Sequence, residues 1–458
     1  MSWSARRRVF PNRRGKPADS GRAALAWGAA AALCLAALAC TSVFNGVQVF
    51  ALPEEDVRSP QILFRPDEGL QRGYFPELQK YLEELPPEEL QRSASYLSLY
   101  GKILMARGDY ERAWRVLERA RDLEPKTQRR GEIEWALSQG AILWNDFRSA
   151  YEYAENAVRD GYGLVPGFLK FLSAMVDVPV YSGAAPGETH TADFQMREFD
   201  LLRLPVRVNE VPSEAIVDTG AVYSIVTRSF ARQAGVREIP DATASGRGFH
   251  RREFPVTFGV LDTLAFAGFT LRDVPVMLMP DDALLFETSR GQFPVPAVLG
   301  LHLLKEFIVD IDYGSRRIAW TRADFRLPKQ DPNQNLFLNR GRLFVRASIN
   351  RNGYFPFLLD TGSEPTMLTS AGLSRARLKS SNALAPRKVH GLGKSRVEWQ
   401  RIGQVTIGIG GFGVRFRDLI VQEADATFED GVIGNSFLEN FRVRIDFSKM
   451  VLLLESGS

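Results

Sequence analysis

Cysteine is almost absent from this chain of 458 residues. The only two cysteines, Cys34 and Cys40, lie in an apolar run near the N-terminus, so everything after Cys40 lacks this residue. A disulfide framework, a thiolate nucleophile and a cysteine metal site are therefore excluded for the body of the protein.

Histidine and the common hydrolase motifs are also scarce. No serine stands in a G-x-S-x-G turn, and the glycines within 408–413 match a dinucleotide fingerprint but lie between β-type runs and open no helix. We therefore expect no metal and no cofactor. Neither metal-ligand spacing nor an H-E-x-x-H helix is found among the four histidines, which are His190, His250, His302 and His390.

Net positive charge is missing from the body of the chain. Residues 1–39 hold seven Lys or Arg against the single Asp19, a net charge of +6, whereas the whole chain carries +4. The remaining residues are therefore slightly acidic, at about −2. This balance gives no electrostatic support for binding nucleic acid, and we expect no such partner.

The basic N-terminus is followed by an uncharged run from Ala23 to Cys40, which extends to Phe44 if two hydroxyl residues are allowed. A basic stretch before an apolar run is typical of an export signal or a membrane anchor, so we expect the body to lie outside the membrane, in a bacterial cell envelope. Three alternatives remain open for residues 1–44. In the first, the end of the run resembles a bacterial lipobox with Cys40 as the acylated residue. In the second, the run is an uncleaved membrane anchor, and in the third it is a simple cleaved signal.

Residues 55–180 are predicted to form a helical domain, because apolar residues recur at helical spacing and β-branched residues are few. A segment that starts at Gly108 returns 37 residues later at Asn145, and the pattern resembles a tetratricopeptide repeat. Because so few repeats would leave one apolar face exposed, we expect that face to pack on a neighbouring domain or a protein partner. An ordinary packing domain is the alternative. The resemblance to a tetratricopeptide repeat rests on the large, small and terminating residues Leu97, Tyr100, Gly101, Leu104, Gly108, Tyr110, Ala113, Leu117, Ala120 and Pro125.

After a predicted linker at 181–195, short β-type runs separated by Gly, Pro and Asp predict an all-β region. The region is duplicated. Val298–Gly300 in the first copy matches Val432–Gly434 in the second, and the apolar residues that follow have the same spacing in both copies. The duplication predicts two related lobes, at 196–328 and 333–456.

The triplet Asp-Thr-Gly occurs once in each copy, at 218–220 and at 360–362, each time after an apolar run. Two carboxylates brought within hydrogen-bond distance cannot both ionise cheaply, so they share one proton and titrate as a pair. Such a pair supplies a base and an acid together. The ionised member of Asp218 and Asp360 would take a proton from water while the protonated member polarises a carbonyl group.

The ordered motifs of residues 196–456 resemble the pepsin-like and retropepsin-like aspartic peptidases. This resemblance implies two β-barrel lobes, each giving one catalytic Asp to a shared cleft. It also implies that Thr219 and Thr361 exchange hydrogen bonds between the lobes and hold the carboxylates coplanar. Gly220 and Gly362 would let the backbone pass close beneath the dyad and would offer it N–H donors.

Two glycine-rich stretches lie where that family places flaps that close over substrate. A peptide bound in such a cleft is extended, so the expected substrate is an exposed or disordered protein segment. The predicted flap residues are Gly246, Gly248, Phe249, Gly391, Leu392 and Gly393.

The sequence thus predicts an aspartic endopeptidase of the envelope, tethered by a lipid or a helix, whose helical repeats bind a protein partner. The alternative is a non-catalytic peptide-binding or scaffold module of an envelope complex, since a fold alone does not give a function.

Overall fold

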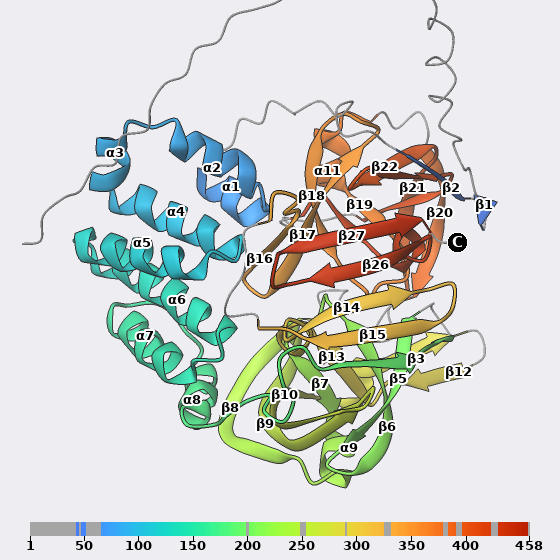
Figure 1. Ribbon diagram of the computed structural model, residues 1–458, viewed down its shortest axis with the longest axis horizontal. Helices are drawn as coiled ribbons and strands as arrows, with labels where there is room; N and C mark the ends of the chain where they lie inside the picture. Colours follow the sequence, from blue (N-terminus) through green and yellow to red (C-terminus); the bar gives the residue numbers. More distant parts are fainter. Residues whose placement is uncertain are drawn as a thin grey trace, which may run out of the picture. The chain divides into compact units, whose positions relative to one another are not determined.

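A helical region followed by two β lobes makes up the part of the chain that the computed structural model describes (Figure 1). No helix in that part is long and apolar enough to cross a membrane. The apolar run of residues 23–40 and the predicted lipidation site Cys40 lie outside it. The described residues are 43–44, 47–51, 66–197, 201–247, 253–288, 291–324, 331–378, 383–390, 396–422 and 429–456.

The helical region contains two helical hairpins, α4 with α5 and α6 with α7. In both hairpins the second residue after the first helix has a positive φ, +80° at Gly108 and +59° at Asn145, as glycine and asparagine allow. The second helices begin at the matching positions Tyr110 and Phe147 of the repeated segment. The helices are α1 (Pro66–Arg72), α2 (Phe75–Glu83), α3 (Pro87–Arg92), α4 (Ala94–Ala106), α5 (Tyr110–Leu123), α6 (Thr127–Leu143), α7 (Phe147–Arg159) and α8 (Pro166–Met175).

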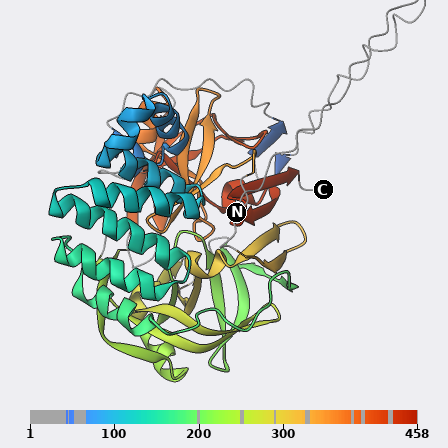
Figure 2. The ribbon, with the colours of Figure 1, turned by 60° about the vertical axis from the view of Figure 1, so that its left-hand side comes forward.

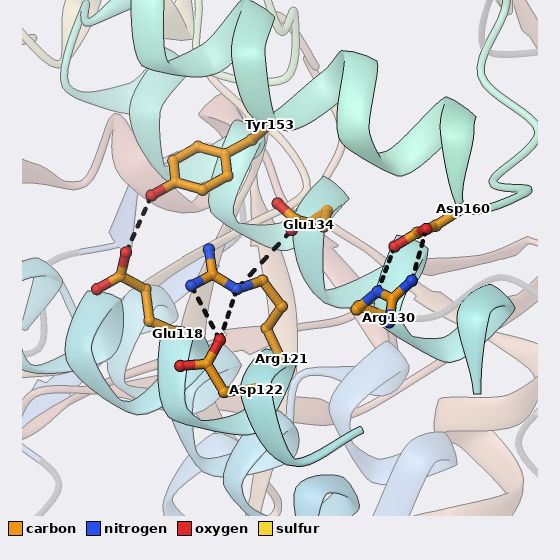
Figure 3. Close-up of polar contacts among 7 residues, drawn as sticks. All are labelled: Glu118, Arg121, Asp122, Arg130, Glu134, Tyr153 and Asp160. Atoms are coloured by element: carbon orange, nitrogen blue, oxygen red, sulfur yellow. Dashed lines mark hydrogen bonds and ion pairs between the residues drawn. The ribbon is translucent and has the colours of Figure 1, made fainter. Parts of the chain in front are cut away.

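Small residues and polar contacts hold these helices together. The side chains of Ala113, Ala120 and Ala150 are fully buried, so neighbouring helices approach closely. Polar side chains link α5, α6 and α7 as Figure 3 shows. The contacts are Tyr153 to Glu118 at 3.2 Å, Arg121 to Glu134 at 3.8 Å, and the two bonds from Arg130 to Asp160 at 2.6 and 2.9 Å.

Lobe 1 is built on an eight-stranded sheet in the order β4-β5-β6-β13-β7-β10-β9-β8, and β11 and β12 pair with each other in a separate two-stranded sheet. A further pairing between β5 and β9 curls the sheet toward a barrel. Its elements are β4 (Gln195–Arg197), β5 (Leu201–Val208), β6 (Val211–Asp218), β7 (Ser224–Thr227), α9 (Arg228–Gln233), β8 (Arg237–Arg247), β9 (Glu253–Phe266), β10 (Phe269–Met279), β11 (Leu285–Thr288), β12 (Gly291–Pro294), β13 (Ala297–Gly300) and α10 (Leu301–Leu304).

Lobe 2 repeats this pairing pattern in a larger sheet, with β17, β18, β19 and β25 in the places of β5, β6, β7 and β13. Strand β2 extends its edge by pairing with β23. The elements are β1 (Val43–Phe44), β2 (Val47–Ala51), β16 (Leu336–Asn339), β17 (Arg342–Ile349), β18 (Tyr354–Leu359), β19 (Met367–Thr369), α11 (Ser370–Arg375), β20 (Ala383–His390), β21 (Arg396–Ile402), β22 (Val405–Ile409), β23 (Phe412–Phe416), β24 (Leu419–Gln422), β25 (Gly431–Ile433) and α12 (Asn435–Leu438).

A third sheet joins the lobes, in the order β27-β26-β14-β15-β3. Strands β14 (Phe307–Asp312) and β26 (Phe441–Asp446) are the two copies of one duplicated segment, and they pair with each other antiparallel. Strand β15 spans Arg317–Arg322 and β27 spans Val451–Ser456.

The segment 181–195, predicted as a linker from its glycine and proline content, includes regular structure. It contains strand β3 (Thr189–Asp193), which pairs with β15, and Tyr181 is buried. The strand was missed because it is a polar edge strand with no buried residue, so its sequence lacks the apolar alternation of a typical strand.

The helical region packs on both lobes (Figures 1 and 2). On lobe 1, Phe171 of α8 stacks on Phe258 of β9 with ring centroids 4.4 Å apart. On lobe 2, Phe75 of α2 contacts Phe337 and Phe344, at 5.2 and 6.0 Å between centroids. One hydrophobic core contains residues of the helices and of both lobes. The two lobes therefore cover much of the apolar face of the helical repeats.

Candidate active site

Each Asp-Thr-Gly triplet stands where a central strand of its lobe ends. Strand β6 ends at Asp218 and pairs in parallel with β13, and β18 ends one residue before Asp360 and pairs in parallel with β25. The backbone N–H of Asp360 donates to the Ile433 carbonyl at 3.0 Å. Paired strands on both sides therefore fix the backbone that carries each carboxyl.

The two triplets meet across the interface between the lobes. The carboxyls of Asp218 and Asp360 are hydrogen-bonded to each other, and neither residue is fully buried. A Cβ atom on Gly220 would lie 2.6 Å from Asp360 Cγ, and one on Gly362 would lie 2.6 Å from Asp218 Oδ2. Because each glycine lies against the opposite carboxyl, any side chain there would displace the dyad.

Backbone N–H donors reach the two carboxyls unequally. Asp218 Oδ1 accepts from the N–H of Gly220 at 2.7 Å and of Ala221 at 3.1 Å. Asp360 Oδ1 accepts from Gly362 at 2.9 Å. The residue that matches Ala221 is Ser363, and its N–H donates instead to the backbone carbonyl of Asp360 at 3.2 Å.

This inequality favours ionisation of Asp218 over ionisation of Asp360. Burial raises the pKa of Asp218, while the N–H donors of Gly220 and Ala221 oppose the rise. Burial raises the pKa of Asp360 well above its ordinary range, and the adjacent charge of Asp218 raises it further. We therefore assign the proton to Asp360 and the negative charge to Asp218.

Thr219 and Thr361 exchange hydrogen bonds between the lobes. Thr219 Oγ1 accepts from the N–H of Thr361 at 3.0 Å and donates to the carbonyl of Leu359 at 2.7 Å. In the reciprocal pair, Thr361 Oγ1 accepts from the N–H of Thr219 at 3.1 Å and donates to the carbonyl of Val217 at 2.8 Å. Both threonines are buried, so these four bonds tie together the peptides that carry the carboxyls.

Two antiparallel hairpins, β8 with β9 and β20 with β21, lie next to the predicted flap residues in the sequence. Gly246 lies near the end of β8, where a Cβ would come within 2.8 Å of Val256 Cγ1. Gly248 and Phe249 lie outside the described residues, as do the second-lobe glycines and Leu392, which fall within 391–395.

Sequence reasoning missed two buried residues behind the dyad, Asn435 and Tyr313. Asn435 Nδ2 donates to the Thr361 carbonyl at 2.9 Å, and Tyr313 Oη donates to Asn435 Oδ1 at 2.8 Å. The duplication could have revealed them, because the matching positions in the other copy are the apolar Leu301 and Phe447.

Other polar candidates lie elsewhere. His302 is buried and stacks on Tyr223 with centroids 4.5 Å apart, and burial lowers its pKa to about 3. It is therefore a neutral core residue. Across the described ranges, no group of three His, Cys, Asp or Glu is arranged to hold a metal ion.

Family models match both lobes. Residues 204–303 match the model described as aspartyl protease, and residues 345–440 match the one described as gag-polyprotein putative aspartyl protease. Each lobe therefore resembles an aspartyl protease domain. The predicted double-lobe, mostly β class with an N-terminal helical region is therefore confirmed.

Solved structures with a similar fold come from several sources, at low identity. A retropepsin-like aspartic protease from Rickettsia conorii is 16% identical, over 30% of this chain and 96% of its own, with a TM-score of 0.22. An aspartic proteinase from Irpex lacteus is 14% identical, over 59% and 98%, with a TM-score of 0.39. Basic 7S globulin from soybean is 14% identical, over 60% and 96%, with a TM-score of 0.36. No curated relative matches this chain.

Proposed function

We propose that this protein is an aspartic endopeptidase that hydrolyses peptide bonds of envelope or secreted proteins. The observation that supports the proposal most directly is the pair of hydrogen-bonded carboxyls, Asp218 and Asp360, at the ends of matching strands of two aspartyl protease lobes. Each carboxyl also accepts a backbone N–H from the glycine of its own triplet.

The unequal surroundings of the dyad assign a role to each carboxyl. Ionised Asp218 takes a proton from a water molecule between the carboxyls as the water oxygen attacks the scissile carbonyl carbon. Protonated Asp360 gives its proton to the carbonyl oxygen, which forms a neutral tetrahedral diol without a covalent enzyme intermediate. The proton taken by Asp218 then passes to the leaving nitrogen, the C–N bond breaks, and Asp360 recovers a proton from the diol.

An extended protein segment is the substrate form that this arrangement favours. A strand-like peptide offers its backbone to hairpin edges on both sides, and the hairpins β8 with β9 and β20 with β21 supply such edges. The glycines and Phe249 predicted at the hairpin tips would act as flaps that exclude water.

The test of substrate is N-terminal proteomics on envelope and secreted proteins incubated with the wild-type protein or with Asp218→Asn. The proposal predicts new N-termini that appear with the wild type and are missing with the variant. Identical peptide maps from the two proteins would favour the non-catalytic binding module instead.

We further propose that the protein is held at the outer face of a bacterial membrane through residues 1–44. The basic stretch before the apolar run supports this location. Mass spectrometry of the mature N-terminus separates the alternatives: a lipid on Cys40, an intact Met1, or cleavage without a lipid. Cleavage without a lipid, or an intact N-terminus on protein recovered from the soluble fraction, would contradict a tether.

The helical region is proposed to recruit the protein substrate. The apolar side chains that are available there to contact a substrate are those of Tyr81, Leu123, Val158 and Val165, each at least 40% exposed. Replacing the four by serine should raise KM for a folded protein substrate and leave KM for a short peptide unchanged. Leu453→Ser, at 43% exposure on β27, is the matched control. An unchanged KM for the protein substrate would contradict recruitment.

A further inference from the structure

The two halves of the active site differ at one buried point behind the dyad. Asn435 is fully buried at the start of α12 and stands two residues after β25. In the other copy the matching residue, directly after β13, is Leu301. Tyr313, which follows β14, is matched by Phe447, which follows β26. The pair is therefore polar in one half and apolar in the other.

The polar pair forms a chain of hydrogen bonds with a single possible direction. The Thr361 carbonyl can only accept, so the atom of Asn435 that lies 2.9 Å from it is the amide nitrogen. The amide oxygen then faces Tyr313 Oη at 2.8 Å, and the tyrosine hydroxyl must donate. Both side chains are buried, which makes each lost bond costly.

The chain continues through one peptide group to the catalytic carboxyl. The carbonyl that accepts from Asn435 belongs to the peptide between Thr361 and Gly362, and the N–H of that same peptide donates to Asp360 Oδ1 at 2.9 Å. A hydrogen bond to a peptide carbonyl polarises the group and makes its N–H a stronger donor. Asp360 has this one N–H donor, whereas Asp218 has two.

We propose that Tyr313 and Asn435 are positioning residues through which lobe 1 orients and strengthens the Gly362 N–H bond to Asp360. This role rests on the proposed aspartic endopeptidase function. Tyr313 belongs to lobe 1 and Asp360 to lobe 2, so the chain of bonds makes the state of one catalytic carboxyl depend on correct docking of the two lobes.

The charged groups near this chain define its pH dependence. Asp360 is faced by the carboxyl of Asp218 and, from β17, by Arg342, whose charge lowers the pKa of Asp360. Burial raises the pKa of Tyr313, with Glu439 raising it and Arg316 lowering it. The Gly362 N–H also lowers the pKa of Asp360. Weakening that bond should therefore let Asp360 keep its proton to higher pH.

The test compares Tyr313→Phe, Asn435→Leu and the double variant, which together install the residues of the other half. We expect kcat to fall by about tenfold, KM to change little, and the alkaline limb of the pH–kcat profile to move to higher pH. Asn440→Ala is the matched control, because its amide donates to two backbone carbonyls of α12, at 2.9 and 3.0 Å, and not to the peptide that binds Asp360. The control should leave the alkaline limb in place.

Carboxyl ¹³C NMR titration of Asp360 in the same variants gives a readout that does not need catalysis. A titration that moves to higher pH in Tyr313→Phe and stays unchanged in Asn440→Ala supports the inference, even if no peptide is cleaved and the proposed function fails. Cleavage with unchanged titration and an unmoved alkaline limb in Tyr313→Phe overturns the inference and leaves the proposed function standing. If Asn435→Leu does not fold, Tyr313→Phe alone decides, because it keeps the ring and removes one oxygen.

Discussion

At the scale of single residues, the threonine hydroxyls of the triplets are the most constrained side chains of the site. Each hydroxyl serves one N–H and one carbonyl of the opposite lobe. Thr219→Val should lower the free energy of unfolding by about 2–4 kcal/mol, because two buried backbone groups lose their partner. Thr219→Ser keeps the hydroxyl and should cost less than half as much. Equal losses in urea denaturation would assign the effect to packing rather than to hydrogen bonds.

The raised pKa of Asp360 also predicts how stability changes with pH. The folded protein holds a proton on Asp360 that the unfolded chain has already released, so stability falls as pH rises from the ordinary Asp range through the raised pKa. The loss accumulates at about 1.4 kcal/mol per pH unit within that window. Asp360→Asn should remove this loss, so its advantage in melting temperature over the wild type should grow with pH. A constant difference between pH 4 and pH 8 would contradict the assignment.

Residue-scale prediction from the sequence was possible where a motif repeats, and the roles predicted for those residues remain predictions. The Asp, Thr and Gly of each triplet could be named because the motif repeats. Comparing the two copies marks Asn435 and Tyr313 as the polar members of otherwise apolar positions, but their contact across 122 positions is visible only in the structure.

At the scale of elements, helix α8 lies directly on strand β8 of lobe 1. A Cβ on Gly167 would come within 2.7 Å of the Thr243 carbonyl carbon, whereas one on Gly163 would meet open space. Gly167→Ala should therefore lower the free energy of unfolding by about 1–3 kcal/mol, and Gly163→Ala should change it little. Thermal unfolding of the two variants checks this, and equal stability would mean that α8 does not rest on β8 in solution.

Helices and buried strands were more accessible to sequence reasoning than edge strands. The helical hairpins follow from their spacing and from the left-handed residues Gly108 and Asn145. Strand β3 alternates exposed and half-buried residues, all of them polar except Ala192, and pairing with β15 holds it in the folded state. Its position in the inter-lobe sheet depends on a contact between segments far apart in the sequence, which local sequence patterns do not record.

At the scale of the whole molecule, a buried ionic cluster joins the helical region to lobe 1. Glu306 binds Arg322 at 2.9 Å, pairs with Lys305 and accepts from Asn145 in the α6–α7 turn at 2.8 Å. Burial by itself would raise the pKa of Glu306, but the charges of Lys305 and Arg322 outweigh it and lower the pKa. The cluster therefore stabilises the fold above the ordinary range of a Glu carboxyl, and this stabilisation is lost as pH falls through the lowered pKa.

Glu306→Gln tests that cluster. It should lower the free energy of unfolding by about 3–5 kcal/mol at neutral pH, because it leaves buried positive charge without its partner. The difference from the wild type should shrink as pH falls and the wild-type carboxyl gains a proton. Urea denaturation at pH 7 and pH 4 measures both, and a difference that grows on acidification would contradict the account.

The central claim is that both lobes of this one chain build a single active site, so both aspartates are needed. The most direct measurement is the rate at which the wild type, Asp218→Asn and Asp360→Asn cleave the same unfolded protein substrate. Each variant should keep the fold, as seen by circular dichroism, and lose about four decades of rate, or roughly 5 kcal/mol of transition-state stabilisation. Near-normal cleavage by either single variant would contradict the shared dyad.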